Sequence, residues 1–212
     1  DEYVGEEAWK ELCQRDDIDL IYITTPWHLH TPMAVYAMEQ GKHVAIEVPA
    51  ATSVAECWQL VDTSERTRRH CMMTENCVYD YYEMTVLNMA QQGLFGEILH
   101  TTGGYVHCLD RLLCKPDPRW RVERMRIFRG DPYPTHGLGP VCQLLNIHRG
   151  DRLDFLVSVD TKAVVGRELY ADATGERPEE FKNGDQTSTF IRTVNGKVIN
   201  LFHNVVTPRP YH

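Results

Sequence analysis

Two proton-transfer side chains lie close together in the stretch DPYPTHGLGP, residues 131–140. Tyr133 carries a phenol that can donate or accept a hydrogen bond, and His136 carries an imidazole, the side chain that titrates nearest to neutral pH. Pro132 and Pro134 restrict the backbone around both residues, which favours fixed positions for groups that act on one bound molecule. The pair is suited to general acid and base catalysis.

Further polar and aromatic residues follow two apolar runs, at residues 24–30 and 47–49, and others lie at 75–76. The carboxyl ends of parallel strands are where open α/β sheets bind ligands, so these three segments are a candidate ligand site. Taken singly, each residue has an ordinary structural explanation. Trp27 would pack under a loop, Asn76 would lie in a turn and Tyr105 would be a strand aromatic.

Residues 1–80 have the alternating pattern of a parallel sheet with helical crossovers. Residues 18–23 form a continuous apolar run, typical of a strand buried on both faces, residues 43–49 predict another buried strand, and residues 70–76 predict a third strand. Helices are expected at 5–15, 32–40 and 54–67, the second followed by Gly41 and the third preceded by Thr52 or Ser53 with Glu56 placed for a capping box.

Residues 81–212 follow a different pattern, that of an α+β domain with a mostly antiparallel sheet. Strands are expected at 96–107 and 154–165, and a hairpin at 188–206 turns at Asn195-Gly196. Helices are expected at 82–92 and 137–148. Residues 112–131 are basic and irregular, which predicts a long surface excursion.

The composition favours a small-molecule substrate. The formal net charge is −8 over 212 residues, which disfavours nucleic acid and anionic membrane surfaces as partners. No apolar run has the length of a membrane span. The seven cysteines are scattered, and no third ligand is spaced suitably beside His28 and His30, so we expect neither a disulfide framework nor a metal site.

A nucleotide-binding domain of this type normally opens with a glycine-rich turn after its first strand, and an acidic residue follows about twenty residues later. Neither feature is present in residues 1–80. Gly137 and Gly139 form a lone G-x-G pair that follows no predicted strand. The sequence therefore predicts either a domain that binds no nucleotide or the second half of one that does.

Two motifs resemble the oxidoreductase superfamily Gfo/Idh/MocA: TPWHLH at residues 25–30, and GKHV at 41–44 followed by EVP at 47–49. Members usually carry a proton-transferring lysine where this chain has Val48, which argues against an ordinary sugar dehydrogenase. The chain also contains the longer segments WHLHTPMAVYAMEQGKHVAIEVPAA, ECWQLVDTSERTRRHCMM with EN at residues 75–76, GEILH, YPTHGLGP, LLNIHRGDR and TPRPY. These segments resemble glycoside hydrolase family 109, the NAD-dependent α-N-acetylgalactosaminidases.

The resemblance implies a reaction and a cofactor. The sugar is oxidised transiently at C3 by tightly bound NAD, the C2 proton is removed, the glycosidic group leaves, water adds and the hydride returns. By this resemblance the residues that line the cofactor are Trp27, His28, Leu29, His30, Glu47, Val48, Asn76, Tyr133, Pro134, Thr135 and His136. Those that contact the sugar are Tyr105, Arg121, Tyr133 and Tyr211, and the catalytic residues are His136, Tyr133 and Tyr105.

Two alternatives stay open at this point: a dehydrogenase with net hydride transfer to NAD(P), and a sugar-binding member without catalysis. The resemblance also implies that residues for the glycine turn precede Asp1 and that more sheet follows His212. It further implies a bacterial, exported protein whose targeting segment lies outside this chain. The sequence leaves open whether the protein is a homo-oligomer.

Overall fold

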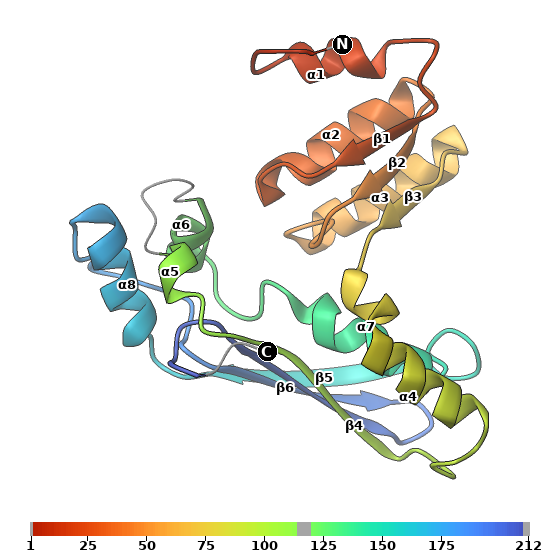
Figure 1. The fold of residues 1–212 in the computed structure, drawn as a ribbon, viewed down its shortest axis with the longest axis vertical. Coiled ribbons are helices and arrows are strands. Elements are labelled where there is room, and N and C mark those ends of the chain that lie inside the picture. Colours follow the sequence, from red (N-terminus) through yellow and green to blue (C-terminus); the bar gives the residue numbers. More distant parts are fainter. Residues whose placement is uncertain (1, 114–119, 210–212) are drawn as a thin grey trace. The chain divides into compact units, whose positions relative to one another are not determined.

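The computed structural model describes residues 2–113 and 120–209. The chain forms two compact units, residues 1–75 and 76–212. Figure 1 shows the elements of each unit in sequence colours. Among the residues described, no helix is long and apolar enough to cross a membrane.

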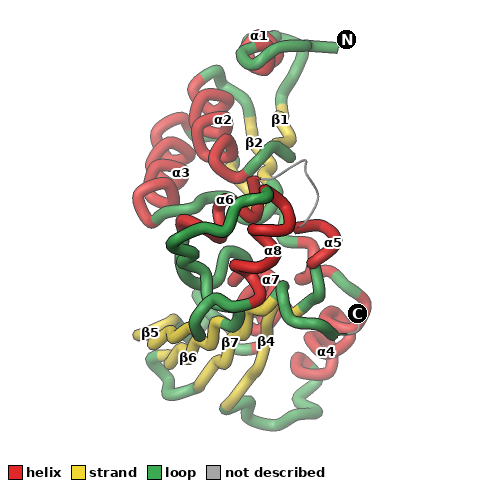
Figure 2. Tube along the Cα trace, turned by 90° about the vertical axis from the view of Figure 1, so that its left-hand side faces the viewer, coloured by secondary structure: helices red, strands yellow, loops and turns green. Residues whose placement is uncertain are grey.

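The first unit is a three-stranded parallel sheet with helices on one face. Its elements are α1 (Ala8–Cys13), β1 (Leu20–Ile23), α2 (Trp27–Glu39), β2 (His43–Ile46), α3 (Val54–Thr67) and β3 (Cys71–Met73), with strand order β1-β2-β3. Figure 2 shows α2 and α3 on the same side of these strands. The predicted parallel α/β sheet is confirmed.

Within the described residues, the helices cover one face of this sheet. Ile21, Ile23, Val44 and Ile46 are buried against α2 and α3. On the other face of β1, Leu20 is 55% exposed and Tyr22 53%. The prediction of a strand buried on both faces is therefore wrong for β1, because both helices pack on the same side.

Helix α2 begins five residues earlier than the sequence predicts. Pro32 was expected to start the helix, but the helix begins at Trp27 and Pro32 lies within it. Two buried residues hold the early turns. His30 bonds to two loop carbonyls, described below, and the Thr31 hydroxyl donates to the Ala50 carbonyl at 3.2 Å. These contacts offset the free-energy cost of Pro32, which has no N–H for a backbone hydrogen bond within the helix.

The predicted caps are confirmed. Gly41, after α2, has the positive φ of +82° that glycine adopts at little strain. At α3 the Ser53 hydroxyl accepts from the Glu56 N–H, and the Glu56 carboxylate accepts from the N–H and the hydroxyl of Thr52.

The second unit is a four-stranded mixed sheet with helices. Its elements are η1 (Asn76–Tyr79), α4 (Tyr81–Gln91), β4 (His100–Val106), α5 (Asp110–Leu113), α6 (Trp120–Ile127), α7 (Pro134–Leu144), β5 (Leu153–Asp160), α8 (Val165–Thr174), β6 (Thr187–Thr193) and β7 (Val198–Asn204). The strand order is β4-β7-β6-β5. Two of the three pairings are antiparallel and β4 pairs with β7 in parallel, so the mostly antiparallel sheet and the hairpin are confirmed.

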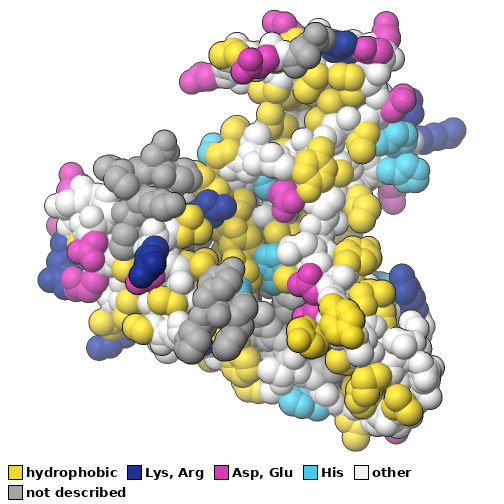
Figure 3. Space-filling view, in the orientation of Figure 1, with side chains coloured by type: hydrophobic (Ala, Val, Ile, Leu, Met, Phe, Trp, Pro, Cys, Tyr) yellow, Lys and Arg dark blue, Asp and Glu magenta, His cyan; other side chains and the backbone are white. Residues whose placement is uncertain are grey.

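The core of this unit lies between α7 and the sheet. Val141 and Leu145 of α7 are buried against Ile191, Ile199 and Leu201 of β6 and β7. Helix α4 buries none of its residues, and hydrophobic side chains gather over it in Figure 3. Its first two residues, Tyr81 and Tyr82, have more than three-quarters of their surface exposed.

Two predictions in this unit are wrong. Residues 120–127 form helix α6 rather than an irregular excursion, because Val122 and Met125, three residues apart, are both buried. The strand predicted at 154–165 ends at Asp160, and Val165 begins α8. The Asp185 carboxylate accepts hydrogen bonds from the N–H groups of Val164, Val165 and Gly166 at 2.8–3.0 Å. These bonds fix the start of α8, so residues 164–166 do not continue the strand.

Candidate active site

The candidate site of the second unit is a group of aromatic rings around Tyr105, near the end of β4. The Tyr105 ring centroid lies 4.7 Å from that of His136, 4.8 Å from Tyr133 and 4.4 Å from His107. His203, its partner in the β4–β7 register, stacks at 6.2 Å. The structure thus brings together the three residues that the sequence analysis selected as catalytic, all three half-buried.

A contact between glycine backbones sets the spacing of these rings. A β carbon on Gly137 would lie 2.3 Å from the Gly104 nitrogen and 2.7 Å from the Gly103 carbonyl carbon. No side chain fits in this space, so α7 lies directly on β4. Because His136 precedes Gly137 and Tyr105 follows Gly104, the contact also brings their rings into stacking distance.

The start of α7 is fixed by the residues before it. The Asp131 carboxylate accepts from the Tyr133 N–H at 2.8 Å, and Pro134 occupies the first helical position, where its missing N–H is not needed. Burial raises the pKa of Asp131 to about 6, and the hydrogen bond and the nearby His136 oppose that rise. This carboxyl group therefore titrates close to neutral pH beside the rings.

Burial also lowers the pKa of both other histidines in the group. The pKa of His203 falls to about 4, chiefly because the ring is buried and secondarily because His107 lies near it. The pKa of His107 is lowered first by burial and then by the electrostatic effects of His136 and Arg209. These shifts favour the neutral form of both rings, which suits proton acceptors or aromatic walls.

The sequence analysis missed four members of this site: Asp131, His107, His203 and Arg209. Asp131 lies within the stretch that drew attention to Tyr133 and His136. His107 follows Tyr105 by two residues, so the period-two alternation of a strand places it on the same side. His203 could not be found, because only the pairing of β4 with β7 brings it to Tyr105.

The predicted residues of the first unit lie at the carboxyl ends of its strands. Trp27 begins α2 and is buried, His28 and Leu29 are exposed in the same turn, and Val48 is buried. The Glu47 carboxylate accepts from the Tyr22 hydroxyl at 2.6 Å and from the Val48 N–H at 3.3 Å. Tyr22, which the sequence analysis did not select, therefore orients Glu47.

His30 joins two of the strand-end loops. Its Nδ1 lies 2.8 Å from the Pro49 carbonyl oxygen, its Nε2 lies 2.6 Å from that of Thr25, and its ring is 1% exposed. These contacts fix the loops that follow β1 and β2. If His30 contributes to a cofactor site, it does so indirectly, by fixing the positions of those loops.

The remaining predicted residues have less defined surroundings. Asn76 is exposed at the start of η1, and the hydroxyl oxygen of Thr135 is buried without a hydrogen-bond partner among the described residues. The Arg121 guanidinium lies over Trp120, 4.3 Å from the ring centroid. Tyr211 lies outside the described residues. The ligand roles of all these residues stay predictions.

Comparisons with known proteins first define the class. Residues 3–75 match the oxidoreductase family with an NAD-binding Rossmann fold, GFO_IDH_MocA. An inositol dehydrogenase homolog from Azotobacter vinelandii, solved with NAD+, shares the fold with a TM-score of 0.72 at 18% identity, over 95% of this chain and 49% of that one. An NAD binding oxidoreductase from Klebsiella pneumoniae gives 0.73 at 22%, over 95% and 51%. The chain thus has the fold of these oxidoreductases.

The family follows from the second unit. Residues 79–212 match the C-terminal domain of glycosyl hydrolase 109, and the chain belongs to glycosyl hydrolase family 109. Glycosyl hydrolase family 109 protein 1 of Phocaeicola vulgatus is 60% identical over 98% of this chain and 44% of its own length. The Alpha-N-acetylgalactosaminidase of Bacteroides fragilis is 52% identical over 100% of this chain and 52% of its own. The chain therefore spans about half the length of these curated relatives.

Proposed function

We propose that this chain is part of a glycosidase that releases terminal α-linked N-acetylgalactosamine, or a similar hexose, by transient oxidation of the sugar at C3. The main support is the group in which the Tyr105 ring contacts both Tyr133 and His136 within 5 Å. Family membership and the name of the Bacteroides fragilis relative support the substrate class.

The first unit has groups that fit NAD at its strand ends. Helix α2 begins there with Pro26 as its N-cap, which supplies no side-chain acceptor, and its first turn has no acidic residue. The positive end of the α2 helix dipole at these strand ends favours a phosphate group. The Glu47 carboxylate, held by Tyr22, adds an acceptor for ribose or amide groups. In the second unit, the Thr135 hydroxyl is a further candidate contact.

NAD held at these strand ends would supply the hydride acceptor for oxidation at sugar C3 and the hydride donor for the later reduction. In our proposal His136 takes the proton of the C3 hydroxyl. The Nδ1 atom of His136 faces Cys77, so Nε2 is the nitrogen that we assign to this step. The resulting ketone acidifies the neighbouring C2 proton.

Tyr105 and Tyr133 provide the next two proton transfers. One phenol takes the proton from C2 and the other supplies a proton to the leaving glycosidic oxygen, so that the C1–O bond breaks as a C1–C2 double bond forms. Water then adds at C1, the proton returns to C2, and reduction at C3 restores the sugar. Which tyrosine performs which transfer is left open by their similar distances from His136, 4.7 and 5.2 Å.

Arg209 is suited to bind the sugar. Its guanidinium donates to the Thr207 hydroxyl at 2.6 Å, and its charge lowers the pKa of His107 in the aromatic group. A guanidinium next to aromatic rings offers several donors to sugar hydroxyls or an acetamido oxygen. We assign it to substrate binding.

The test is an assay on the full-length protein. Without added NAD, the purified protein should release nitrophenol from p-nitrophenyl α-N-acetylgalactosaminide. A dehydrogenase, which the match to an oxidoreductase model over residues 3–75 makes the second candidate, would instead accumulate NADH with a free sugar. Accumulation of NADH without glycoside cleavage would contradict the first proposal.

A further inference from the structure

We propose that Cys77 is a positioning residue for His136. Its sulfur accepts a hydrogen bond from the Nδ1–H of His136 and thereby directs Nε2 to the reacting sugar. This inference rests on the proposed role of His136 as a base. It concerns a residue that neither the sequence motifs nor the family comparison selects.

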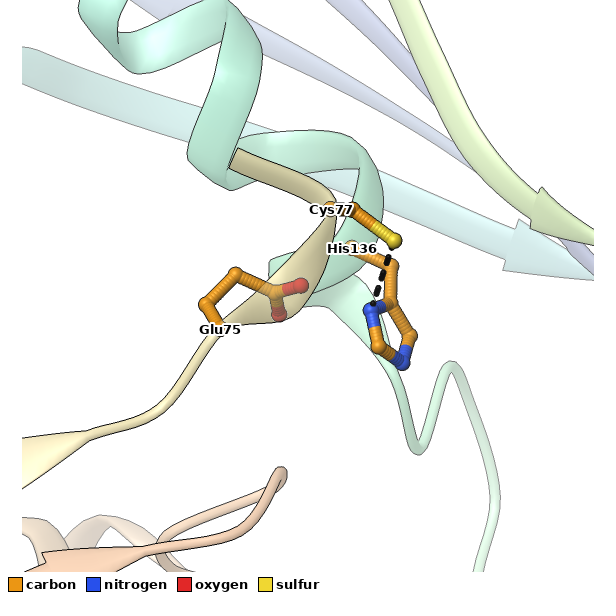
Figure 4. A group of neighbouring side chains, drawn as sticks. All are labelled: Glu75, Cys77 and His136. Carbon is orange, nitrogen blue, oxygen red and sulfur yellow. Dashed lines mark hydrogen bonds between the residues drawn. The ribbon is translucent and has the colours of Figure 1, made fainter. Parts of the chain in front are cut away.

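The contact joins two elements of the second unit. The Sγ atom of Cys77 lies 3.3 Å from Nδ1 of His136, within the range for a sulfur hydrogen bond (Figure 4). Cys77 is the second residue of η1, and His136 lies in the first turn of α7, which packs on η1. Both side chains are partly buried, so water competes only weakly with the bond.

Stacking alone does not determine which ring atom faces the sugar. The His136 ring lies at 22° to the Tyr105 ring, and Tyr133 lies 5.2 Å away at 32°. A half-turn of the imidazole about its χ2 bond keeps the same plane but exchanges Nδ1 with a carbon. A ring carbon gives Cys77 a much weaker contact, so the hydrogen bond favours one of the two orientations.

The same contact selects the tautomer that a base needs. When Nδ1–H donates to sulfur, the ring is in the tautomer whose lone pair lies on Nε2, the atom proposed to accept the C3 hydroxyl proton. A base oriented by a third group through its other ring nitrogen is the arrangement of many hydrolase sites. Here the Nδ1 contact is with a thiol, so the bond is weak while the ring is neutral and becomes stronger when the ring is protonated.

The position of Cys77 also relates His136 to the proposed cofactor site. Asn76, the preceding residue, is one that the family resemblance assigns to the cofactor. A shift of η1 would therefore move a cofactor contact and the Nδ1 partner of His136 together. Alkylation or oxidation of Cys77 is expected to remove the bond to His136 and so to affect the chemical step.

The experiment compares Cys77→Ala and Cys77→Ser with Cys142→Ala in the full-length protein. Cys142 is a partly buried thiol on α7, six residues after His136, so its variant controls for the loss of a thiol on that helix. We expect Cys77→Ala to lower kcat about three- to tenfold with little change in KM, the usual effect of one hydrogen bond. It should also shift the acidic limb of the kcat–pH profile. Cys77→Ser, which keeps an acceptor, should restore part of kcat.

A second measurement does not require turnover. Nitrogen-15 NMR of the His136 ring, assigned with His136→Gln, should show a protonated Nδ1 in the wild type and in Cys142→Ala. It should show a mixture of tautomers in Cys77→Ala. An unchanged tautomer together with an unchanged pH profile in Cys77→Ala would overturn the proposal. Because NMR reads the ring directly, an inactive wild type would contradict the glycosidase function without deciding the role of Cys77.

If Cys77→Ala does not fold, the same tautomer and pH-profile measurements on Cys77→Ser test the proposal. A serine variant with a wild-type melting temperature whose His136 tautomer is mixed would support dependence on sulfur. Full retention of both tautomer and pH profile would support a hydrogen bond that oxygen can replace. A protonated Nε2 in the folded wild type would overturn the proposal.

Discussion

The backbones of Gly137 and Gly104 touch, and a β carbon on Gly137 would lie 2.3 Å from the Gly104 nitrogen. This contact fixes the distance between α7 and β4 at the point where each presents a proposed catalytic ring. The stacking of His136 on Tyr105 at 4.7 Å follows from it. The small residues are therefore as important to the site as the rings themselves.

Gly137→Ala is expected to separate α7 from β4. The added methyl group meets backbone atoms, which cannot rotate away, so the free energy of unfolding should fall by about 1–3 kcal/mol. Denaturant unfolding of the full-length protein measures the change, and glycoside cleavage should fall more than stability alone explains. Gly93→Ala is the control: its φ of +75° strains an alanine backbone, but no atom lies within 4 Å of its β carbon, so it should lose stability without a selective loss of cleavage. An equal loss of cleavage in both variants at matched stability would contradict this account.

Replacement of the proposed base should abolish turnover without unfolding the protein. His136→Gln keeps a polar side chain of similar reach but cannot take up a proton, so kcat should fall about 10²- to 10⁴-fold. Circular dichroism and the melting temperature check the fold. His100→Gln, at an exposed histidine of β4 bonded to Asn200, should retain activity. Substantial activity in His136→Gln would show that another group accepts the C3 proton.

The buried His203 predicts acid sensitivity. Its folded pKa of about 4 lies below the unfolded value of 6.5, so the unfolded chain binds more protons between these values. The stability associated with this ring is present above pH 6.5 and is lost as the pH falls towards 4. Between pH 7 and pH 5 the loss should be on the order of 2 kcal/mol.

Comparison with a variant isolates this contribution. Asp131, with its pKa raised to about 6, changes stability in the opposite direction over the same interval, because its folded form gains the proton first. The difference in stability between pH 7 and pH 5 should therefore be measured in wild type and in His203→Gln. The variant should lose less stability on acidification. An identical difference would mean that His203 does not titrate as proposed.

The Tyr22 hydroxyl should affect NAD binding through Glu47. Tyr22→Phe removes the 2.6 Å hydrogen bond that orients the carboxylate, and the ring remains. We expect NAD to bind about three- to tenfold more weakly, as measured by calorimetry on cofactor-free full-length protein. Tyr36→Phe, which loses a hydroxyl bonded to Gln14, is the matched control. Unchanged affinity in Tyr22→Phe would remove Glu47 from the proposed cofactor site.

Local sequence patterns predicted most elements because their determinants are close in sequence. The capping residues of α3 and the Asn195-Gly196 turn act within a few residues, and both are confirmed. The prediction that residues 120–127 are irregular was wrong. The two apolar residues with helical spacing, Val122 and Met125, lie among basic residues and form too short a pattern to indicate a helix. The early start of α2 was missed because His30 is held by carbonyls from two separate loops.

The residues of the candidate site were likewise predictable where their contacts are local in sequence, and not where the contacts depend on packing between distant segments. Tyr133 and His136 are three residues apart in one helix turn, so their proximity was predictable. Their approach to Tyr105 depends on the packing of two glycine backbones, and His203 joins only through strand pairing. The Cys77 sulfur contacts His136 across 59 residues of sequence, and no local pattern indicates it.

The central claim, transient oxidation of the sugar at C3, is tested most directly by isotopes. The full-length protein should cleave the glycoside in deuterated water with incorporation of deuterium at C2 of the released sugar, and it should cleave a C3-deuterated substrate more slowly than the unlabelled one. Cleavage without label at C2 and without a C3 isotope effect would contradict the account.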